Sequence, residues 1–164
     1  MMKDNHARPI IFALSNPTKN AECSAEQAYQ WTDGSVIFAS GSPFDPVRLG
    51  GRTFVPGQGN NMFIFPGLGF GAMKAQCKSV SDKMIVAAAQ VLSDYVTDAE
   101  IAKGNIYPPI EDIRTISALI ASKVMQVGQQ EGLTSAPLPA SSSSLARWVQ
   151  DEMYVPEYII RSRL

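Results

Sequence analysis

The feature that most constrains the fold is an unbroken apolar run, R-P-I-I-F-A-L-S, at residues 8–15. Apolar and polar residues do not alternate along it, which is typical of a strand covered on both faces in a parallel sheet. The run stops at Asn16-Pro17, because proline disfavours helix at the preceding residue and has no amide hydrogen to continue a ladder. Such a strand predicts a chain of the α/β class, with helices packed on a parallel sheet.

A helix and a second buried strand follow this run. Ser24 and Gln27 have the spacing of a capping box that opens a helix, and Gly34 suits the left-handed position that closes one. Residues 35–40, S-V-I-F-A-S, form another apolar run before the turn at residues 41–43. Strand, helix and strand in this order predict a parallel pair joined by a right-handed crossover.

The next part of the chain has mainly helical spacing. Residues 43–59 have the composition of a loop, with one short β-branched piece at residues 53–55. Three predicted helices follow, and each begins and ends at a recognisable signal. The first begins at a Ser79–Asp82 capping box, and its apolar face carries Met84, Ile85, Ala88, Val91, Leu92 and Tyr95. The second is capped by Thr97 and Glu100 and ended by Gly104. The third has an apolar stripe from Ile110 to Val127 and ends at Gly132.

Composition shifts after residue 132. Two prolines and the four serines at residues 141–144 predict a flexible connection. Residues 145–164 regain apolar side chains and predict a tail that docks on the rest of the chain. We therefore divide the chain into residues 1–132 and 133–164. Its strong strands are too few for a complete doubly wound sheet, which usually has about five or six. The apolar residues of the tail are Trp148, Tyr154, Tyr158 and Ile159.

Charge and composition exclude several classes of function. The net charge is -1 and no lysine or arginine cluster occurs, so we expect no binding of nucleic acid or of an anionic membrane surface. No apolar run approaches the ~20 residues of a membrane span. Cys23 and Cys77 have no C-x-x-C spacing and His6 is the one histidine, so we expect free thiols and no zinc site. Residues 1–8 do not resemble a signal or transit peptide, and the compartment stays open.

Residues 67–72, G-L-G-F-G-A, satisfy the G-x-G-x-x-A pattern of a dinucleotide fingerprint. Three features argue against that function. The apolar stretch before it, residues 62–65, is short for a strand; Pro66 would strain a tight strand-to-helix turn; and no acidic residue ends a second strand about 20 residues later. The sequence instead favours a glycine-rich helix start that packs closely on its neighbours.

Two amide-bearing turns are better candidates for a binding site. Asn16 follows the first strand, and ligands of open parallel sheets collect beyond the carboxyl ends of strands; a plain Asx-Pro turn is the alternative. Asn60 and Asn61 display two amides after P-G-Q-G, which suits a small polar anion; a surface turn is the alternative. No G-x-S-x-G elbow occurs, and the carboxylates at residues 98–100 and 111–112 lie at helix starts, so no convincing nucleophile or general base is found.

Taken together, these segments resemble the malic enzymes. The similarity rests on R-P-I-I-F-A-L-S-N-P-T with A-E-C-S-A-E-Q-A-Y, then F-A-S-G-S-P-F-D-P-V, then F-V-P-G-Q-G-N-N-M-F-I-F-P-G, and continues through G-N-I-Y-P-P-I-E-D-I-R. It covers residues 8–132 and, more loosely, the tail. The resemblance implies an α/β fold: an incomplete Rossmann-like parallel sheet within a partial NAD(P)-binding domain, followed by a carboxyl-terminal helical region.

The resemblance also implies a reaction. Malic enzymes oxidatively decarboxylate (S)-malate to pyruvate and CO2 with NAD or NADP, and Mn2+ or Mg2+ acts as a Lewis acid. By resemblance, Asn16 and Asn60 bind the substrate, and Asn16 and Asn61 contact the cofactor. No catalytic residue or metal ligand is assigned to this chain, because the family's tyrosine, lysine, acidic metal ligands and fingerprint precede the S-N-P-T strand. The family usually forms homo-oligomers, so we expect one in the full-length form.

The position of the match predicts that this chain is the carboxyl-terminal part of a malic enzyme and is inactive alone. The alternative is a non-catalytic remnant, which would associate with a full-length relative through its sheet edge and helices.

Overall fold

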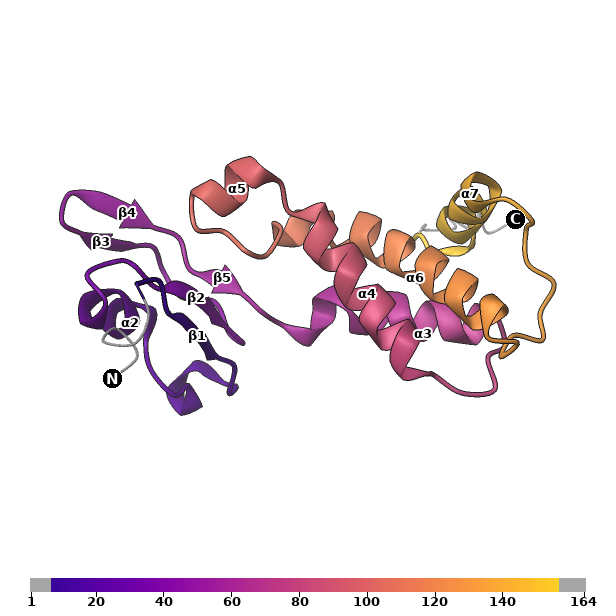
Figure 1. Cartoon of the computed structure of the whole chain (residues 1–164), viewed down its shortest axis with the longest axis horizontal. Helices are drawn as coiled ribbons and strands as arrows, with labels where there is room; N and C mark the ends of the chain where they lie inside the picture. Colours follow the sequence, from indigo (N-terminus) through magenta and orange to yellow (C-terminus); the bar gives the residue numbers. More distant parts are fainter. Residues whose placement is uncertain (1–6, 157–164) are drawn as a thin grey trace, which may run out of the picture.

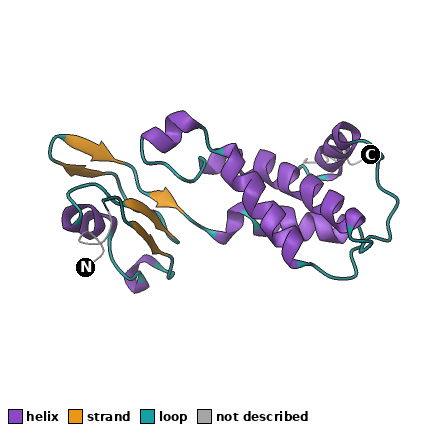
Figure 2. Cartoon of the chain, viewed as in Figure 1, coloured by secondary structure: helices purple, strands orange, loops and turns teal. Residues whose placement is uncertain are grey.

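The structure is a computed structural model that describes residues 7–156. Figure 1 shows a small parallel sheet at one end of the molecule and a bundle of helices at the other. The sheet has the strand order β1-β2-β5, and Figure 2 shows how loops separate it from the helical part. The prediction of an α/β chain with a parallel sheet and a carboxyl-terminal helical region is confirmed. The elements of the sheet are β1 (Ile10–Ala13), β2 (Ile37–Ser40) and β5 (Gly57–Gln58); those of the bundle are α3 (Phe65–Lys74), α4 (Asp82–Tyr95) and α6 (Ile113–Gln130).

The first unit folds as its local signals predict. β1 and β2 pair in parallel, with Ile10 opposite Ile37. Helix α2 (Ala25–Trp31) lies between them in the chain and begins at the predicted capping box, where Ser24 and Gln27 satisfy each other's backbone amides. Gly34 has φ +75°, which is the left-handed conformation expected after the helix.

Only one face of β1 is covered. Ala13 and Phe38 pack in a buried cluster with residues of α2, whereas alternate residues on the other face of β1 stay open to solvent. Ile10 is 56% exposed and Phe12 is 43% exposed. The expectation of a strand covered on both faces is therefore wrong for the described residues, because α2 packs on one side and no element covers the other.

Residues 43–59 are more ordered than a loop. β3 (Val47–Leu49) and β4 (Arg52–Phe54) form an antiparallel hairpin, in which the predicted piece at residues 53–55 takes part. Gly50 and Gly51 both have positive φ, and a two-residue turn of this kind matches the twist of the two strands.

The glycine run lies inside a helix. Residues 61–63 form a short 3-10 helix, η2 (Asn61–Phe63), so no strand precedes the glycines, and α3 follows directly. A Cβ on Gly67 would lie 2.7 Å from the Ser117 carbonyl oxygen, and one on Gly71 would lie 2.8 Å from that of Ala121. Both glycines let α3 approach α6 closely, as expected for a glycine-rich helix that packs on its neighbours.

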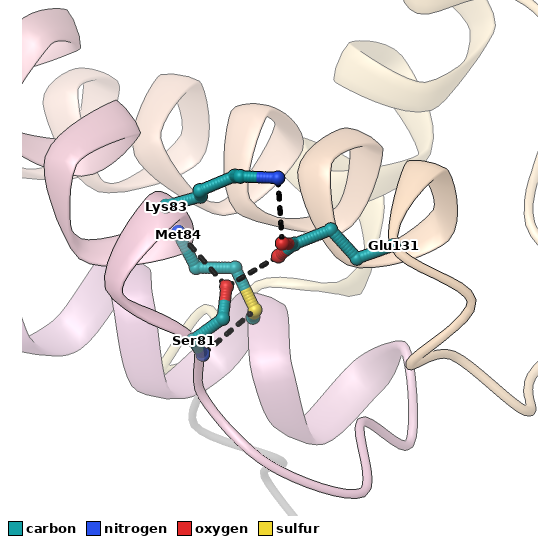
Figure 3. A network of polar contacts seen from close by, with 4 residues as sticks. All are labelled: Ser81, Lys83, Met84 and Glu131. Carbon is teal, nitrogen blue, oxygen red and sulfur yellow. Dashed lines mark hydrogen bonds and ion pairs between the residues drawn. The ribbon is translucent and has the colours of Figure 1, made fainter.

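Helix α4 begins two residues later than predicted. Its N-cap is Ser81, whose hydroxyl oxygen accepts a hydrogen bond from the Met84 amide at 3.2 Å, so the Ser79–Asp82 capping box is wrong. The Ser81 hydroxyl also donates to Glu131, which forms an ion pair with Lys83 at 3.3 Å (Figure 3). Ser81 thus has a partner fifty residues away in the sequence, which a local pattern does not reveal.

The two remaining predicted helices are present. α5 (Asp98–Ala102) begins at the Thr97–Glu100 capping box, and Gly104 follows it with φ +92°. The third begins as a 3-10 turn, η3 (Ile110–Asp112), before α6, and Gly132 with φ +67° follows its end.

The serine-rich segment is helical rather than a flexible connection. α7 (Ser142–Glu152) begins at Ser141, whose side chain accepts from the Ser144 amide. Leu145 and Val149 are buried against residues of α6, including Met125, so burial of one helix face outweighs the weak helix propensity of serine. The predicted docking of the tail is confirmed for α7, whereas Tyr158 and Ile159 lie outside the described residues. No helix in the described range is long and apolar enough to cross a membrane.

Candidate functional site

The predicted amides lie at the carboxyl edge of the parallel sheet. Asn16 follows β1, and Asn60 follows β5. The ladder continues past the strand ends, since the Gly41 amide donates to the Ala13 carbonyl at 3.1 Å and the Gly59 amide donates to the Ser40 carbonyl at 2.8 Å. The loops that carry the two asparagines are therefore tied to the sheet, at the edge where parallel sheets bind ligands.

Asn16 keeps its amide nitrogen available. The Ser42 hydroxyl donates to Asn16 Oδ1 at 2.6 Å, which orients the carboxamide. Asn16 Nδ2 has no hydrogen-bond partner among residues 7–156, and the side chain is exposed. A Cβ on Gly41 would lie 2.8 Å from Asn16 Oδ1 and 2.3 Å from the Leu14 carbonyl, so only glycine fits beside the amide. The result is an oriented donor that faces solvent.

Asn60 is held at both ends of its carboxamide. Asn60 Oδ1 accepts from the Met62 amide at 3.0 Å, which makes Asn60 the N-cap of η2. Asn60 Nδ2 donates to the Gly41 carbonyl at 2.9 Å. The two predicted substrate residues thus meet at Gly41, Asn16 from one side and Asn60 from the other. Asn61 is exposed, and its carboxamide makes no hydrogen bond within the described part of the chain.

A largely apolar pocket of about 530 Å³ adjoins Asn60 and Asn61. Its size lies in the range of small-molecule sites, and apolar walls with a few polar groups are typical of them. The walls come from the open face of β1, from η2, from α4 and from the segment after α5. The lining includes Phe12, Leu14, Ile64, Leu92, Val96 and Tyr107.

Tyr107 is the lining residue that sequence reasoning missed. Its ring lies 5.9 Å from that of Phe63 and 6.4 Å from that of Phe12, measured between centroids. It also supports the turn before Asn60, because a Cβ on Gly59 would lie 3.0 Å from its hydroxyl oxygen. Burial raises the pKa of Tyr107, so the phenol stays neutral at physiological pH. The one sequence signal for it is an aromatic residue directly before Pro108-Pro109, a pair that interrupts helical structure.

A carboxylate lies beside the Asn16 turn but is poorly suited to act as a base. The Ser15 hydroxyl donates to Glu22 Oε1 at 2.6 Å, and the Ser15 amide donates to Glu22 Oε2 at 3.3 Å. The hydroxyl bond, more than the others, lowers the pKa of Glu22. A carboxylate stabilised in its ionised form is a weaker proton acceptor, so Glu22 fixes the turn rather than taking a proton.

The described residues do not provide a metal site. No group of three or more His, Cys, Asp or Glu side chains within residues 7–156 could hold an ion. Cys23 and Cys77 are free thiols, as expected, and burial raises the pKa of each. No metal is therefore assigned to these residues. A nicotinamide fits the donor set better, because its carboxamide oxygen can accept from an oriented amide such as that of Asn16.

Comparison with known sequences gives one consistent result. Residues 1–129 match the family model described as malic enzyme, NAD binding domain. An NADP-dependent malic enzyme of Dictyostelium discoideum is 56% identical over 92% of this chain and 27% of its own length. One of Vitis vinifera is 49% identical over 96% of this chain and 26% of its own length. The chain thus spans about a quarter of the length of these relatives.

Solved structures agree. The malic enzyme of Pyrococcus horikoshii Ot3 superposes with a TM-score of 0.62 at 25% identity, over 87% of this chain and 28% of that one. The malic enzyme of Entamoeba histolytica gives a TM-score of 0.66 at 20% identity, over 85% of this chain and 26% of that one, which concerns the fold alone.

Proposed function

This chain belongs to the malic enzyme family through its NAD-binding domain, and from that premise we propose that it forms the carboxyl-terminal part of a malic enzyme active site. In the complete enzyme the reaction is the oxidative decarboxylation of (S)-malate to pyruvate and CO2. Asn16 and Asn60 bind the substrate, and Asn16 and Asn61 contact the cofactor. The isolated 164-residue chain has no malic enzyme activity.

The observation that carries the proposal is the meeting of Asn16 and Asn60 at Gly41. Two carboxamides from different strand ends are oriented by hydrogen bonds of 2.6 Å and 2.9 Å, and neither carries a formal charge. Amide donors in fixed positions can hold a carboxylate and a nicotinamide carboxamide without repelling either. The apolar walls of the pocket beside Asn60 leave the amides as its main polar groups, which suits the orientation of a small ligand.

These residues orient rather than transfer protons. The titratable group among the described residues that line the pocket is Tyr107, and its raised pKa leaves it protonated. A bound nicotinamide would accept the hydride that leaves C2 of malate. Asn16 and Asn60 shorten the path between the two reactants by fixing their relative position, an effect that can account for a large share of catalysis.

We propose NADP rather than NAD as the cofactor. Relatives at 56% and 49% identity are NADP-dependent malic enzymes by name. The metal, Mn2+ or Mg2+, is held by residues outside the described part of this chain. We further propose a homo-oligomer in the complete enzyme.

A chimera tests the proposal. Residues 8–156 of this chain would replace the matching segment of the Dictyostelium discoideum enzyme, and malate-dependent reduction of NADP would be followed at 340 nm, the ordinary absorbance of NADPH. We expect an active chimera, and a loss of about 10- to 100-fold in kcat/KM for Asn16→Ala or Asn60→Ala, the usual cost of one substrate-positioning hydrogen bond.

Two controls sharpen this test. Asn16→Asp keeps the shape but places a negative charge beside the malate carboxylate, so it should lower kcat/KM more than Asn16→Ala. Gln130→Ala, at the exposed end of α6 and outside the pocket lining, should leave kcat/KM unchanged. An active chimera that tolerates both alanine substitutions at Asn16 and Asn60 contradicts the proposed site, and a reading above the blank from the 164-residue chain alone contradicts its inactivity.

The open face of β1 favours a second candidate function. A non-catalytic piece could associate with a full-length relative through exposed Ile10 and Leu14, which are 56% and 44% exposed. Co-expression with the Dictyostelium discoideum enzyme, followed by co-purification through a tag on this chain, tests it; separate elution of the two proteins excludes it.

A further inference from the structure

A second, polar pocket of about 330 Å³ lies at the opposite edge of the sheet from the asparagines. Arg8 precedes β1 and Val36 precedes β2, and both line this pocket. Because the two strands are parallel, their amino ends meet at this edge. The remaining walls come from the β3–β4 hairpin and from the end of α5. The pocket is therefore distinct from the candidate active site.

Within residues 7–156, three cations from three separate segments line the pocket and no carboxylate does. They are Arg8, Arg52 and Lys103. None of them forms an ion pair with another described residue, whereas Lys74 and Lys83 are paired with glutamates at 2.5 Å and 3.3 Å. The chain as a whole has a net charge of -1, so this concentration of positive charge is local. Like charges gathered in a concave site repel each other, and an anion relieves that repulsion.

Two of the three cations extend from elements that ring contacts or hydrogen bonds hold in place. The Arg52 guanidinium lies 5.2 Å from the centroid of the Phe54 ring, and that ring stacks on Tyr29 at 4.7 Å. Lys103 is the C-cap of α5, and its backbone amide donates to the Glu100 carbonyl at 3.0 Å. Gly34 faces the same ring, since a Cβ there would lie 2.5 Å from it. An aromatic stack and a capped helix thus support two of the three charges.

The carboxylate of Glu100, three residues before Lys103, is not part of the lining. The Glu100 carboxylate is directed back to its own helix cap, where it accepts from the Thr97 hydroxyl at 3.3 Å. Asp33 precedes Gly34 in the chain but is absent from the lining. The carbonyl end of the short helix α5 lies beside Lys103 and weakens the positive potential there.

We propose that this pocket binds a phosphate group, either as inorganic phosphate or as part of a nucleotide. A phosphate presents several oxygens to donors that come from different directions, which suits two guanidinium groups and an ammonium group. The pocket volume accommodates the group with its first shell of water. This inference stands independently of the malate site.

Titration of the 164-residue chain tests the proposal. Inorganic phosphate, AMP and adenosine would be added at constant ionic strength adjusted with chloride, and binding followed by calorimetry and by amide shifts of Gly34 and Gly104. Saturable binding of phosphate and AMP, but not of adenosine, is expected. Equal affinity for phosphate and AMP identifies the free ion as the ligand, and tighter binding of AMP identifies a nucleotide.

Charge-neutral variants decide whether this pocket is responsible. Arg52→Gln and Lys103→Gln should each weaken binding about five- to tenfold, the effect of losing one partly screened charge-assisted hydrogen bond. Arg48→Gln removes the same charge from the same hairpin but not from the lining, and should leave affinity unchanged. Circular dichroism melts confirm that each variant is folded. Absence of saturable binding, or equal weakening by Arg48→Gln, overturns the proposal.

Discussion

The hydroxyl of Tyr107 occupies the space where a side chain on Gly59 would begin: a Cβ there would lie 3.0 Å from the hydroxyl oxygen and 3.1 Å from two ring carbons. The ring cannot move away freely, because Phe12 and Phe63 flank it. Tyr107 thereby packs against the turn that carries Asn60 and limits how closely its backbone can approach the ring.

Gly59→Ala should therefore destabilise the chain by about 1–3 kcal/mol, the usual cost of overpacking. Urea denaturation gives the free energy of unfolding. The cost should be smaller in a Tyr107→Val background, where the ring is absent. Equal costs in both backgrounds would show that Tyr107 is not the obstacle.

Substitution by alanine at two glycines of helix α3 should change the stability of the chain in opposite directions. Gly67→Ala places a methyl group 2.7 Å from the Ser117 carbonyl and should cost about 1–3 kcal/mol or more. Gly69 has no atom within 4 Å of its Cβ position, so Gly69→Ala should stabilise α3 by about 0.5–1 kcal/mol. Thermal melts of the two variants would measure the difference, and shifts of the same sign would contradict the packing of α3 on α6.

Ser81, and not Ser79, should matter for helix α4. Ser81→Ala removes the N-cap and the hydroxyl that donates to Glu131, and should cost about 1 kcal/mol. Ser79→Ala should change stability by less than about 0.5 kcal/mol, as an exposed residue outside the helix. A larger effect at Ser79 in the same denaturation experiment would restore the capping box expected from the sequence.

The network around Glu131 should make stability depend on pH. The Ser81 hydroxyl, and then Lys83, hold the pKa of Glu131 below its ordinary value of 4.5. A carboxyl whose pKa is lowered by folding stabilises the folded state above its unfolded pKa and loses that effect as pH falls through the folded pKa. Glu131→Gln should thus be less stable than the natural chain at pH 7, and the difference should shrink below about pH 4.5.

Denaturant midpoints of the two proteins between pH 7 and pH 3 would measure this convergence. Glu111→Gln, at an exposed carboxylate of η3, is the control for the loss of one negative charge. A gap between the natural chain and Glu131→Gln that stays constant with pH would contradict the network.

The open face of β1 should cause self-association of the isolated chain. Analytical ultracentrifugation over a range of concentrations is expected to show larger species, because an exposed apolar strand at a sheet edge favours pairing. Ile10→Lys should reduce them, and Met73→Lys, on the equally exposed surface of α3, should not. A monodisperse monomer of the natural chain would refute this prediction.

Local signals in the sequence predicted the elements that local contacts decide. The capping residues Ser24 and Thr97 and the closing glycines Gly34 and Gly104 act within their own helices, and all four were identified correctly. The position of Asn16 at the carboxyl edge of the sheet followed from the rule for parallel strands. That of Asn60 did not, because residues 43–59 were predicted to be a loop and β5 pairs with the distant β2. The roles of both remain proposals.

The features that sequence reasoning missed depend on distant partners. Ser79 and Ser81 are equally good caps in isolation, and Glu131 distinguishes them. The serines of α7 are weak helix formers, and burial of Leu145 against α6 decides their conformation. Tyr107 joins the pocket only because two other aromatic rings, remote in sequence, meet it there.

The double anchoring of Asn60 has a thermodynamic consequence. Its side-chain rotamer is already frozen in the folded chain, by Met62 on one side and Gly41 on the other. The loss of rotational entropy therefore belongs to folding, and a ligand that meets this amide does not bear it again. Asn16 is anchored through its oxygen alone and retains more torsional freedom. Of the two amides, Asn60 is therefore the more rigid, and any entropy cost of fixing an amide on binding falls mainly on Asn16.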